Sequence, residues 1–160
     1  MARHRFHGSP ERFDVVAEFI HDYYGRSVRY IADVAGGQGM LSRILTKKYG
    51  YAAEVIDPRG WALRGVSNRS EEYDASMAPY YDLIVGLHPD EATRQVAESA
   101  TERPVVIVPC CNFWDSSQKL GRDALLDALA IYFECNLVSY ERVAFEFGGP
   151  KNLGLVTRRE

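Results

Sequence analysis

A glycine-rich segment, Asp33-Val34-Ala35-Gly36-Gly37-Gln38-Gly39, has the residue types in this chain that best suit binding chemistry. It follows a short apolar run and leads into a helix-like pattern, Met40 to Leu45. Glycines at a strand-to-helix turn let the backbone approach a ligand, and the helix start offers N–H groups without intrahelical partners. A second apolar run ends in Asp57, eighteen residues after Gly39. An acid there can hold ribose hydroxyls in a doubly wound sheet, so the two features together predict a nucleotide site.

Two later segments carry side chains that could act on a substrate. His88 follows the apolar run Asp82 to Leu87, and Asn112 follows the run Pro104 to Pro109 and two cysteines. Ligands of open α/β sheets bind at the carboxyl ends of strands, where both residues are expected. A neutral imidazole could accept a proton from a substrate or hold it by hydrogen bonding. His88 could equally be a structural histidine that caps the next helix.

The adjacent residues Cys110 and Cys111 have three interpretations. They could be small apolar residues at a buried strand end, they could line a substrate pocket, or they could bind zinc together with His88. Adjacent cysteines lack the C-x₂₋₄-C spacing of zinc sites, so we predict no metal centre.

Hydrophobic patterning predicts the elements that position these residues. Ser9 and Pro10 are typical of a helix start, and Gly25 of a helix end. The predicted helices cover about residues 10–24, 40–50, 89–99 and 119–134. The predicted strands are 29–34, the run ending at Asp57, 63–66, 82–87, 104–109, 137–147 and 152–156.

This order of elements predicts the fold class. Repeated strand–helix units favour a parallel sheet with helices on both faces. The last two strands, joined by Gly148-Gly149-Pro150, are predicted to form an antiparallel hairpin. We therefore expect an α/β protein: a three-layer, Rossmann-like, seven-stranded and mostly parallel sheet with an antiparallel C-terminal hairpin, in a single domain over residues 1–160.

Composition narrows the class of protein. A chain of 160 residues with 46% hydrophobic and 26% charged residues suits one globular domain. The net charge of -3 argues against a dedicated nucleic-acid-binding surface. The basic start of the chain could contact phosphates or be a solvated terminus; its members are Arg3, His4, Arg5, His7 and Arg12. No apolar run is long enough to span a membrane, no signal-peptide core is present, and the three cysteines form no disulfide framework. We expect a cytoplasmic protein with no membrane partner.

Two classes of nucleotide cofactor use a glycine turn after the first strand. The nicotinamide fingerprint needs a third small residue, which would be Ser42 here. That fingerprint does not require Asp33. A nicotinamide domain also normally ends on another parallel strand, whereas this chain is predicted to end on a hairpin.

The acid, the glycine turn and the hairpin together resemble the class I S-adenosylmethionine-dependent methyltransferases. The usual first motif of that family is an acid, three further residues and then Gly-x-Gly, which Asp33, Gly37 and Gly39 match. Residue 35, often glycine in that family, is Ala35 here. The family architecture has seven strands with an antiparallel last strand, and the resemblance covers the chain from about residue 28.

The resemblance implies S-adenosyl-L-methionine as the cofactor and gives roles to individual residues. The glycine turn would pass beside the methionine portion, Asp33 would orient its amino group, and Asp57 would hold both ribose hydroxyls. Near the adenine it implies Pro58, Arg59 or Trp61, and one of Glu71, Glu72 or Asp74 at the adenine amino group. The predicted cofactor-binding residues are Asp33, Ala35, Gly36, Gly37, Gly39, Asp57, Pro58, Arg59, Asp74 and Leu87.

A narrower resemblance occurs at the ends of the fourth and fifth predicted strands. Leu87-His88-Pro89-Asp90-Glu91-Ala92-Thr93 and Val108-Pro109-Cys110-Cys111-Asn112 are similar to a methyltransferase subgroup that includes a tRNA 2'-O-methyltransferase. Its members carry Leu-His-x-Cys near Ala-Thr-Asp, and then Pro-Cys-Cys or Cys-Cys-His. This chain lacks the first cysteine, is one residue shorter between His88 and Ala92, and has Arg94 where Asp is common.

The sequence thus predicts an S-adenosylmethionine-dependent methyltransferase with His88 and Asn112 as candidate catalytic residues. The methyl group would pass in line to a nucleophile placed by the loops after the fourth and fifth strands. The subgroup resemblance favours RNA as the acceptor over a small molecule or a protein side chain. The acidic balance counts against RNA, so either a partner subunit supplies recognition or the substrate is small. The alternatives are an NAD(P)-dependent oxidoreductase and a non-catalytic Rossmann-like subunit of a larger complex.

Overall fold

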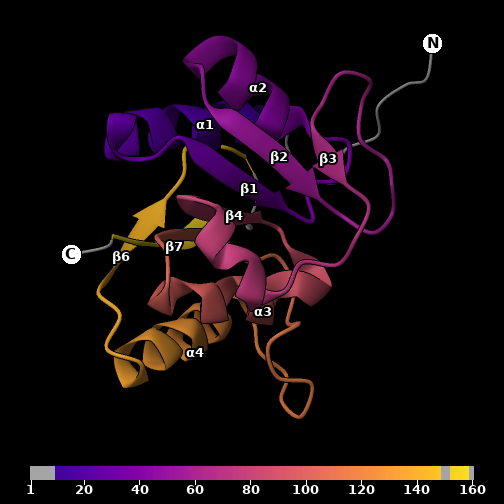
Figure 1. Cartoon of the computed structure of the whole chain (residues 1–160). Coiled ribbons are helices and arrows are strands. Elements are labelled where there is room, and N and C mark those ends of the chain that lie inside the picture. The colour runs from indigo at the N-terminus through magenta and orange to yellow at the C-terminus, as the bar shows by residue number, and fades with distance from the viewer. Residues whose placement is uncertain (1–9, 149–151, 159–160) are drawn as a thin grey trace.

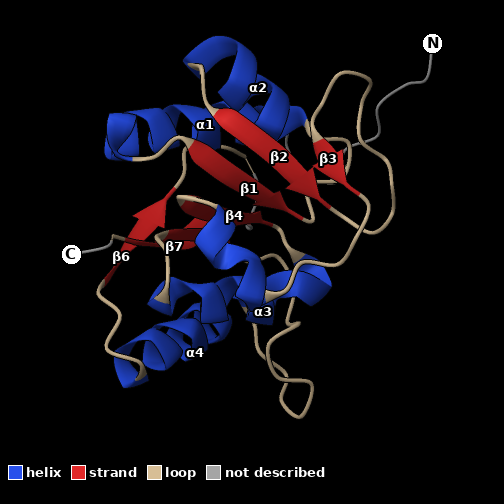
Figure 2. Cartoon of the chain, in the orientation of Figure 1, coloured by secondary structure: helices blue, strands red, loops and turns tan. Residues whose placement is uncertain are grey.

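The computed structural model describes residues 10–148 and 152–158 and places a seven-stranded sheet between two layers of helices (Figure 1, Figure 2). The strand order is β3-β2-β1-β4-β5-β7-β6. β7 is antiparallel to both of its neighbours, while the other pairings are parallel. The strands are β1 (Tyr30–Val34), β2 (Ala52–Ile56), β3 (Asn68–Arg69), β4 (Leu83–Leu87), β5 (Val105–Val108), β6 (Tyr140–Ala144) and β7 (Leu153–Thr157). The predicted fold class is confirmed.

The two faces of the sheet are covered by separate hydrophobic clusters. Alternate residues of β1 separate them: Ile31 packs with α1 and α2, whereas Ala32 and Val34 pack with α3 and α4. All residues of β4 and β5 are buried, as expected for strands covered on both faces. Figure 2 shows α1 and α2 on one side of the sheet and α3 and α4 on the other. The α-helices are α1 (Glu11–Tyr24), α2 (Met40–Tyr49), α3 (Thr93–Glu98) and α4 (Arg122–Cys135).

The helices agree with the sequence prediction except after β4. The predicted helix over 89–99 is divided into a 3₁₀ turn (η3, Asp90–Ala92), the short α3, and a second 3₁₀ turn (η4, Ser99–Thr101). Two other 3₁₀ helices are η1 (Gly25–Ser27) and η2 (Ala75–Tyr80). The predicted N-cap Ser9 lies outside the described residues, and Pro10 occupies the N-cap position of α1. Within the described part of the chain, none of the helices has both the length and the apolarity needed to cross a membrane.

The third strand differs from the prediction. The apolar residues Leu63 and Val66 were expected to form it, but β3 is the pair Asn68–Arg69. Leu63 donates its backbone N–H to the carbonyl of Gln38 (2.8 Å), and the Val66 side chain lies over Gly39. These two residues therefore strap the loop between β2 and β3 onto the glycine turn. They pack there rather than in the sheet.

The first strand of the C-terminal hairpin is shorter than predicted, and the second is shifted by one residue. β6 and β7 pair from Tyr140 opposite Thr157 to Ala144 opposite Leu153. Phe145 and Phe147 were predicted to belong to the first of these strands. Their side chains instead pack in the hydrophobic cluster that contains the buried residues of α1. Residues 149–151 of the predicted joint lie outside the described residues.

Gly154 allows β7 to lie between β5 and β6. A Cβ there would lie 2.8 Å from the Ile107 carbonyl oxygen and 3.0 Å from the Val108 side chain. We expect Gly154→Ala to lower the free energy of unfolding by about 1–3 kcal/mol through overpacking, measured by urea denaturation. Gly121→Ala is the control, because a Cβ there meets nothing within 4 Å. Equal effects of the two substitutions would contradict this prediction.

Candidate functional site

The Asp33 carboxylate lies beneath the glycine turn. The residue is 2% exposed, and its Oδ2 accepts hydrogen bonds from the Ser42 hydroxyl (2.8 Å) and the Ser42 backbone N–H (3.3 Å). These bonds tie the end of β1 to the first turn of α2. A Cβ on Gly36 would lie 2.5 Å from the Asp33 carboxyl carbon, so only glycine fits above the buried acid. Any side chain at residue 36 would therefore collide with the buried Asp33 carboxyl group.

Burial controls the charge of Asp33. Loss of solvent is the largest effect and raises the pKa of its carboxyl group to about 6, even though the two hydrogen bonds from Ser42 lower it. The nearby Asp57 carboxylate raises the pKa further. A cationic group placed close to Asp33 would stabilise its ionised form.

Three residues other than glycine have left-handed backbones at the carboxyl edge of the sheet. They are Ala35 (φ 55°), His88 (φ 52°) and Asp90 (φ 50°). Ala35 is held there by donating its backbone N–H to the Ile56 carbonyl (2.9 Å). Such strain costs roughly 1–3 kcal/mol per residue and is concentrated at functional sites in proteins. All three residues line the same groove, described below.

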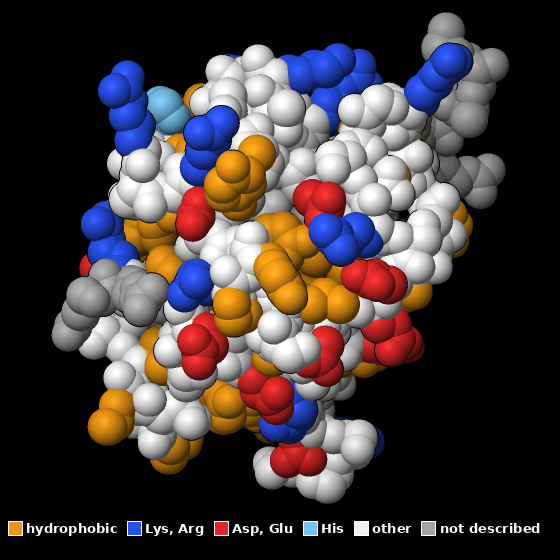
Figure 3. Space-filling view, in the orientation of Figure 1, with side chains coloured by type: hydrophobic (Ala, Val, Ile, Leu, Met, Phe, Trp, Pro, Cys, Tyr) orange, Lys and Arg blue, Asp and Glu red, His pale blue; other side chains and the backbone are white. Residues whose placement is uncertain are grey.

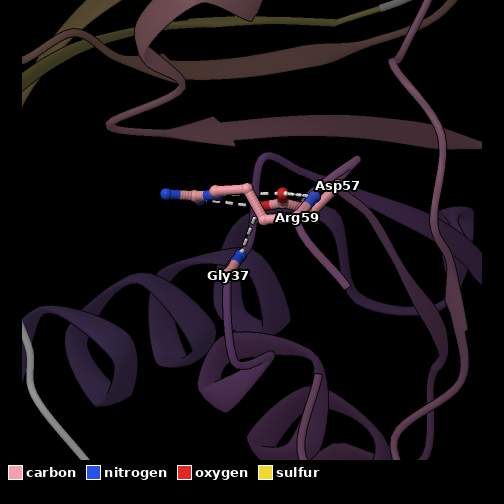
Figure 4. A network of polar contacts seen from close by, with 3 residues as sticks. All are labelled: Gly37, Asp57 and Arg59. Carbon is pink, nitrogen blue, oxygen red and sulfur yellow. Dashed lines mark hydrogen bonds and ion pairs between the residues drawn. The ribbon is translucent and has the colours of Figure 1, made fainter. Parts of the chain in front are cut away.

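Asp57 is at the end of β2 and is 3% exposed. Its Oδ2 accepts from the Gly37 backbone N–H (2.9 Å) and from Nη2 of Arg59 (2.6 Å). Its Oδ1 accepts from the backbone N–H and the Nε of Arg59, both at 2.9 Å. Figure 4 shows this network between Gly37, Asp57 and Arg59. Burial opposes ionisation of Asp57, but the hydrogen bonds from Arg59 and Gly37 prevail and lower the pKa of the carboxyl group.

These four bonds use the full accepting capacity of the Asp57 carboxylate. Ribose hydroxyls could therefore bond to it as predicted only after the Arg59 side chain leaves. That side chain is 42% exposed and lies over the Trp61 ring, 4.4 Å from its centroid. Because the Asp57 carboxylate is buried, the ribose hydroxyls must replace the bonds that the Arg59 side chain gives it.

Two grooves meet at this edge of the sheet and form one continuous site. One has a volume of about 570 Å³ and the other about 840 Å³. Both are lined by Ala35, Arg59, Asp90 and Phe113, which mark where they join. We call the combined space the carboxyl-edge groove.

The smaller part of the groove combines apolar walls with a few polar groups. Ile56, Pro58 and Ala92 give it apolar walls, and Glu72 and Gln95 bring polar groups to it. Among the three acids considered for the adenine amino group, Glu72 lines the groove. Asp74, the acid chosen as the cofactor-binding residue, does not line it; its carboxylate accepts the Ser76 backbone N–H (2.9 Å) and caps η2.

The larger part contains the glycine turn, Leu87 and His88. The His88 backbone N–H donates to the Val108 carbonyl (2.8 Å), which holds the end of β4 beside β5. The half-buried imidazole ring meets the Phe147 ring edge to face, with 6.5 Å between centroids. The structure thus brings together predicted cofactor and catalytic residues from the ends of two strands. Asp33 lies on β1, Leu87 is the last residue of β4, and His88 follows it.

Asn112 is placed differently from the prediction. Its amide nitrogen donates to the carbonyls of Asp115 (2.7 Å) and Gln118 (2.9 Å), and its oxygen accepts the backbone N–H groups of Trp114 (3.1 Å) and Asp115 (3.0 Å). These contacts occupy its donors and its acceptor and organise the loop after β5, and the catalytic role of Asn112 stays a prediction. The neighbouring Phe113, 43% exposed, lines the groove instead.

The two cysteines line the groove beside His88. The Cys110 and Cys111 sulfurs are 3.3 Å apart, and the Cys110 thiol lies 3.7 Å from Oδ1 of Asp90. Among the described residues, no group of three or more His, Cys, Asp or Glu side chains is arranged to hold a metal ion.

Helix α1 contributes groove residues that the sequence analysis did not place in the site. Arg12 is 8% exposed, and its guanidinium lies 4.3 Å from the centroid of the Phe13 ring. Both line the larger part of the groove. Arg12 was grouped with the basic start of the chain, whose other members, within residues 1–9, lie outside the described residues. Helical spacing marks Phe13 as buried, but it does not show that α1 crosses the end of the sheet.

No protein-family model matches the chain, and no curated protein matches it significantly in sequence. Several solved structures are similar to it. The sugar N-methyltransferase KedS8 from a Streptoalloteichus species is 14% identical, with a TM-score of 0.58 over 100% of this chain and 97% of that chain. The bacterial Hen1 methyltransferase domain is 15% identical, with a TM-score of 0.58 over 92% of this chain and 97% of that chain.

The bifunctional kinase-methyltransferase WbdD is 18% identical, with a TM-score of 0.61 over 93% of this chain but only 39% of the longer WbdD chain. At these identities the likenesses establish the fold. The chain has the Rossmann-like architecture that these methyltransferases have.

The raised pKa of Asp33 predicts a pH-dependent stability. An unfolded Asp titrates near pH 4 and the folded Asp33 near pH 6, so the folded state binds more protons between these values. The contribution of Asp33 therefore falls as pH rises from about 4 to about 6. Asp33→Asn should gain up to roughly 3 kcal/mol of stability relative to the unsubstituted protein across this window, measured by urea denaturation. Asp123→Asn, at a side chain 77% exposed, is the control. A stability difference independent of pH would contradict the burial argument.

Proposed function

We propose that this protein is an S-adenosylmethionine-dependent methyltransferase. The observation that carries the proposal is the position of the glycine turn and two buried acids, Asp33 and Asp57, at the carboxyl edge of the sheet. The sheet order and the fold shared with solved methyltransferases support it. In this sheet only β7, which lies next to the edge strand β6, runs antiparallel to the other strands. A nicotinamide domain normally ends on another parallel strand, so this sheet differs from that class.

The groove fits the parts of this cofactor. Asp33, beneath Gly36, supplies negative charge beside the turn, where a cationic amino group would stabilise its ionised form. Met40 and Leu41, in the first turn of α2, line the same space, and a helix N-terminus favours a carboxylate. The apolar walls at Ile56 and Pro58 suit adenine, with Glu72 as the acid for its amino group. Ribose would bind at Asp57 after exchange with Arg59.

The remaining residues act on the acceptor. When bound, the cofactor supplies a methyl group on a positively charged sulfur, which a nucleophile can displace directly. Alignment of the acceptor can therefore supply much of the catalysis. His88, which lines the groove with Leu87 and the cysteines, would hold the acceptor or take its proton. Phe13 and Phe113 give the acceptor end flat apolar surfaces.

For the acceptor we propose RNA, from the motifs at the ends of β4 and β5. KedS8 is described as a sugar N-methyltransferase, so a sugar is the second candidate. An NAD(P)-dependent oxidoreductase and a non-catalytic subunit remain the rival functions. Cofactor binding distinguishes the oxidoreductase from the methyltransferase, and turnover distinguishes the enzyme from a non-catalytic subunit.

A thermal-shift panel with S-adenosylhomocysteine, NADH and NADPH tests the proposal. S-Adenosylhomocysteine at 100 times its dissociation constant should stabilise the protein by about 2.7 kcal/mol, raising Tm by about 5–10 °C. Asp57→Ala should remove the shift, whereas Asp74→Ala, outside the groove lining, should preserve it. A shift with NADH or NADPH alone would support an oxidoreductase. No shift with S-adenosylhomocysteine would exclude the proposed function.

Arg59 gives a second prediction. Because its side chain occupies the oxygens that ribose needs, Arg59→Met should tighten S-adenosylhomocysteine binding up to about fivefold, measured by calorimetry. Arg94→Met is a matched control, since Arg94 also stacks on a tryptophan, Trp114 (4.1 Å), but does not line the groove. Unchanged or weaker binding in Arg59→Met would show that Arg59 does not compete with the ribose.

A further inference from the structure

A second groove lies away from the carboxyl edge. Its volume is about 550 Å³, and it shares no lining residue with the carboxyl-edge groove. It follows the first half of β2, which β3 does not cover because β3 pairs only with Val55 and Ile56. Its walls come from α2, from the segment 64–69 and from the start of β1. We call it the β2-edge groove.

The β2-edge groove is basic in a chain whose net charge is -3. Its lining contains four cationic side chains and one acid, Glu54. Glu54 is already bound by Nε of Arg69 (2.7 Å) and by the Tyr81 hydroxyl (2.6 Å). The other three cations, Arg43, Lys47 and Arg64, form no ion pair with any residue in 10–148 or 152–158. The groove therefore keeps three uncompensated positive charges.

Two exposed tyrosines flank these charges. Tyr30 is 50% exposed and Tyr80 is 80% exposed, although both belong to segments that enter buried strands. Tyr81, the neighbour of Tyr80, is buried and bonded to Glu54, which fixes the backbone that presents the Tyr80 ring. Figure 3 shows this face, with basic side chains over α2, acidic ones around α3, and hydrophobic side chains exposed between them.

We propose that the β2-edge groove binds single-stranded nucleic acid. Unpaired cations in a groove bind a phosphate backbone, and exposed aromatic rings stack on unpaired bases. An acidic peptide would use the cations but has no flat bases for the two rings. A duplex keeps its bases stacked and unavailable to Tyr30 and Tyr80. The combination of both features in one groove favours a single strand.

A nucleic-acid strand bound in the β2-edge groove would extend toward the proposed active site. The loop between β2 and β3 separates the two grooves, with Arg64 on one side and Arg59 on the other. Trp61, 59% exposed, lies between them in sequence and lines the carboxyl-edge groove. The proposal names the acceptor class of the proposed methyltransferase and rests on that function for its purpose. The binding itself needs no cofactor.

Fluorescence anisotropy with labelled strands of about 12 nucleotides tests the proposal on the full chain without cofactor. Single-stranded RNA and DNA of one sequence, the corresponding duplex and inorganic polyphosphate are compared. Three phosphate contacts predict a slope of about -2 for log K against log salt concentration. Lys47→Glu/Arg64→Glu should weaken single-strand binding at least about tenfold and flatten this slope. The stronger of the RNA and DNA arms identifies the source of the strand.

A second double variant with the same change of net charge separates a general effect of charge from a specific effect of the β2-edge groove. Lys48→Glu/Arg142→Glu makes the same change of net charge, next to Lys47 on α2 and on the far edge strand β6, outside the groove. It should retain binding. Tyr80→Ala should weaken RNA binding about fivefold or more but leave polyphosphate binding unchanged, because polyphosphate has no bases.

Equal losses in the two charge variants would overturn the proposal, as would equal affinity for polyphosphate and RNA or stronger binding of the duplex. S-Adenosylhomocysteine binding is measured separately on the same variants. A failure of the nucleic-acid proposal is thereby distinguished from a failure of the proposed methyltransferase function.

Discussion

The buried carboxylate of Asp33 is the constraint on which the site depends. Its bonds to Ser42 join β1 to α2, and its carboxyl group fills the space beneath Gly36 where any side chain would collide. The turn above it must then bend through left-handed residues, including Ala35, to reach the helix. The loop after β2 packs on the same turn, because Val66 fills the space that a side chain at Gly39 would need. One buried acid thus fixes the path of a strand, a turn, a helix and a loop.

The pKa values of the two acids of the site are shifted in opposite directions although both residues are almost fully buried. Burial dominates at Asp33 and raises its pKa, whereas the hydrogen bonds of Arg59 and Gly37 dominate at Asp57 and lower its pKa. Asp57 is therefore a fixed anion that already has a partner, and Asp33 is an acid that a cation would help to ionise. A ligand with a cationic group at one end and neutral hydroxyls at the other matches both requirements. It would stabilise the ionised form of Asp33 and replace Arg59 at Asp57.

The strand ends were predictable from the sequence because short, continuous apolar runs that stop at a polar residue are typical of buried parallel strands. Asp33, Leu87 and His88 were placed together on that basis, and the structure brings them to one groove. The role of Asn112 could not be predicted in the same way, because its partners are backbone groups of a loop whose conformation no periodicity records. The Asp57–Arg59 contact had a local signal: an Asp before Pro often accepts the backbone N–H two residues later. The apolar residues of 63–66 gave a wrong strand prediction, since they pack on the glycine turn instead of the sheet.

The loop between β2 and β3 connects the two grooves physically. Its first part carries Arg59, which holds Asp57, and its second part carries Arg64 at the β2-edge groove. Between them Leu63 is bonded to Gln38 of the glycine turn, which fixes the middle of the loop. Release of Arg59 by a cofactor would free the exposed half of this loop while the Leu63 strap keeps the other half in place. A nucleic-acid strand bound at Arg64 would then reach the carboxyl-edge groove at Arg59 and Trp61, the part of its lining that the cofactor has released. Coupling between cofactor and acceptor therefore requires no second domain: the short segment from Asp57 to Arg69 contacts both sites.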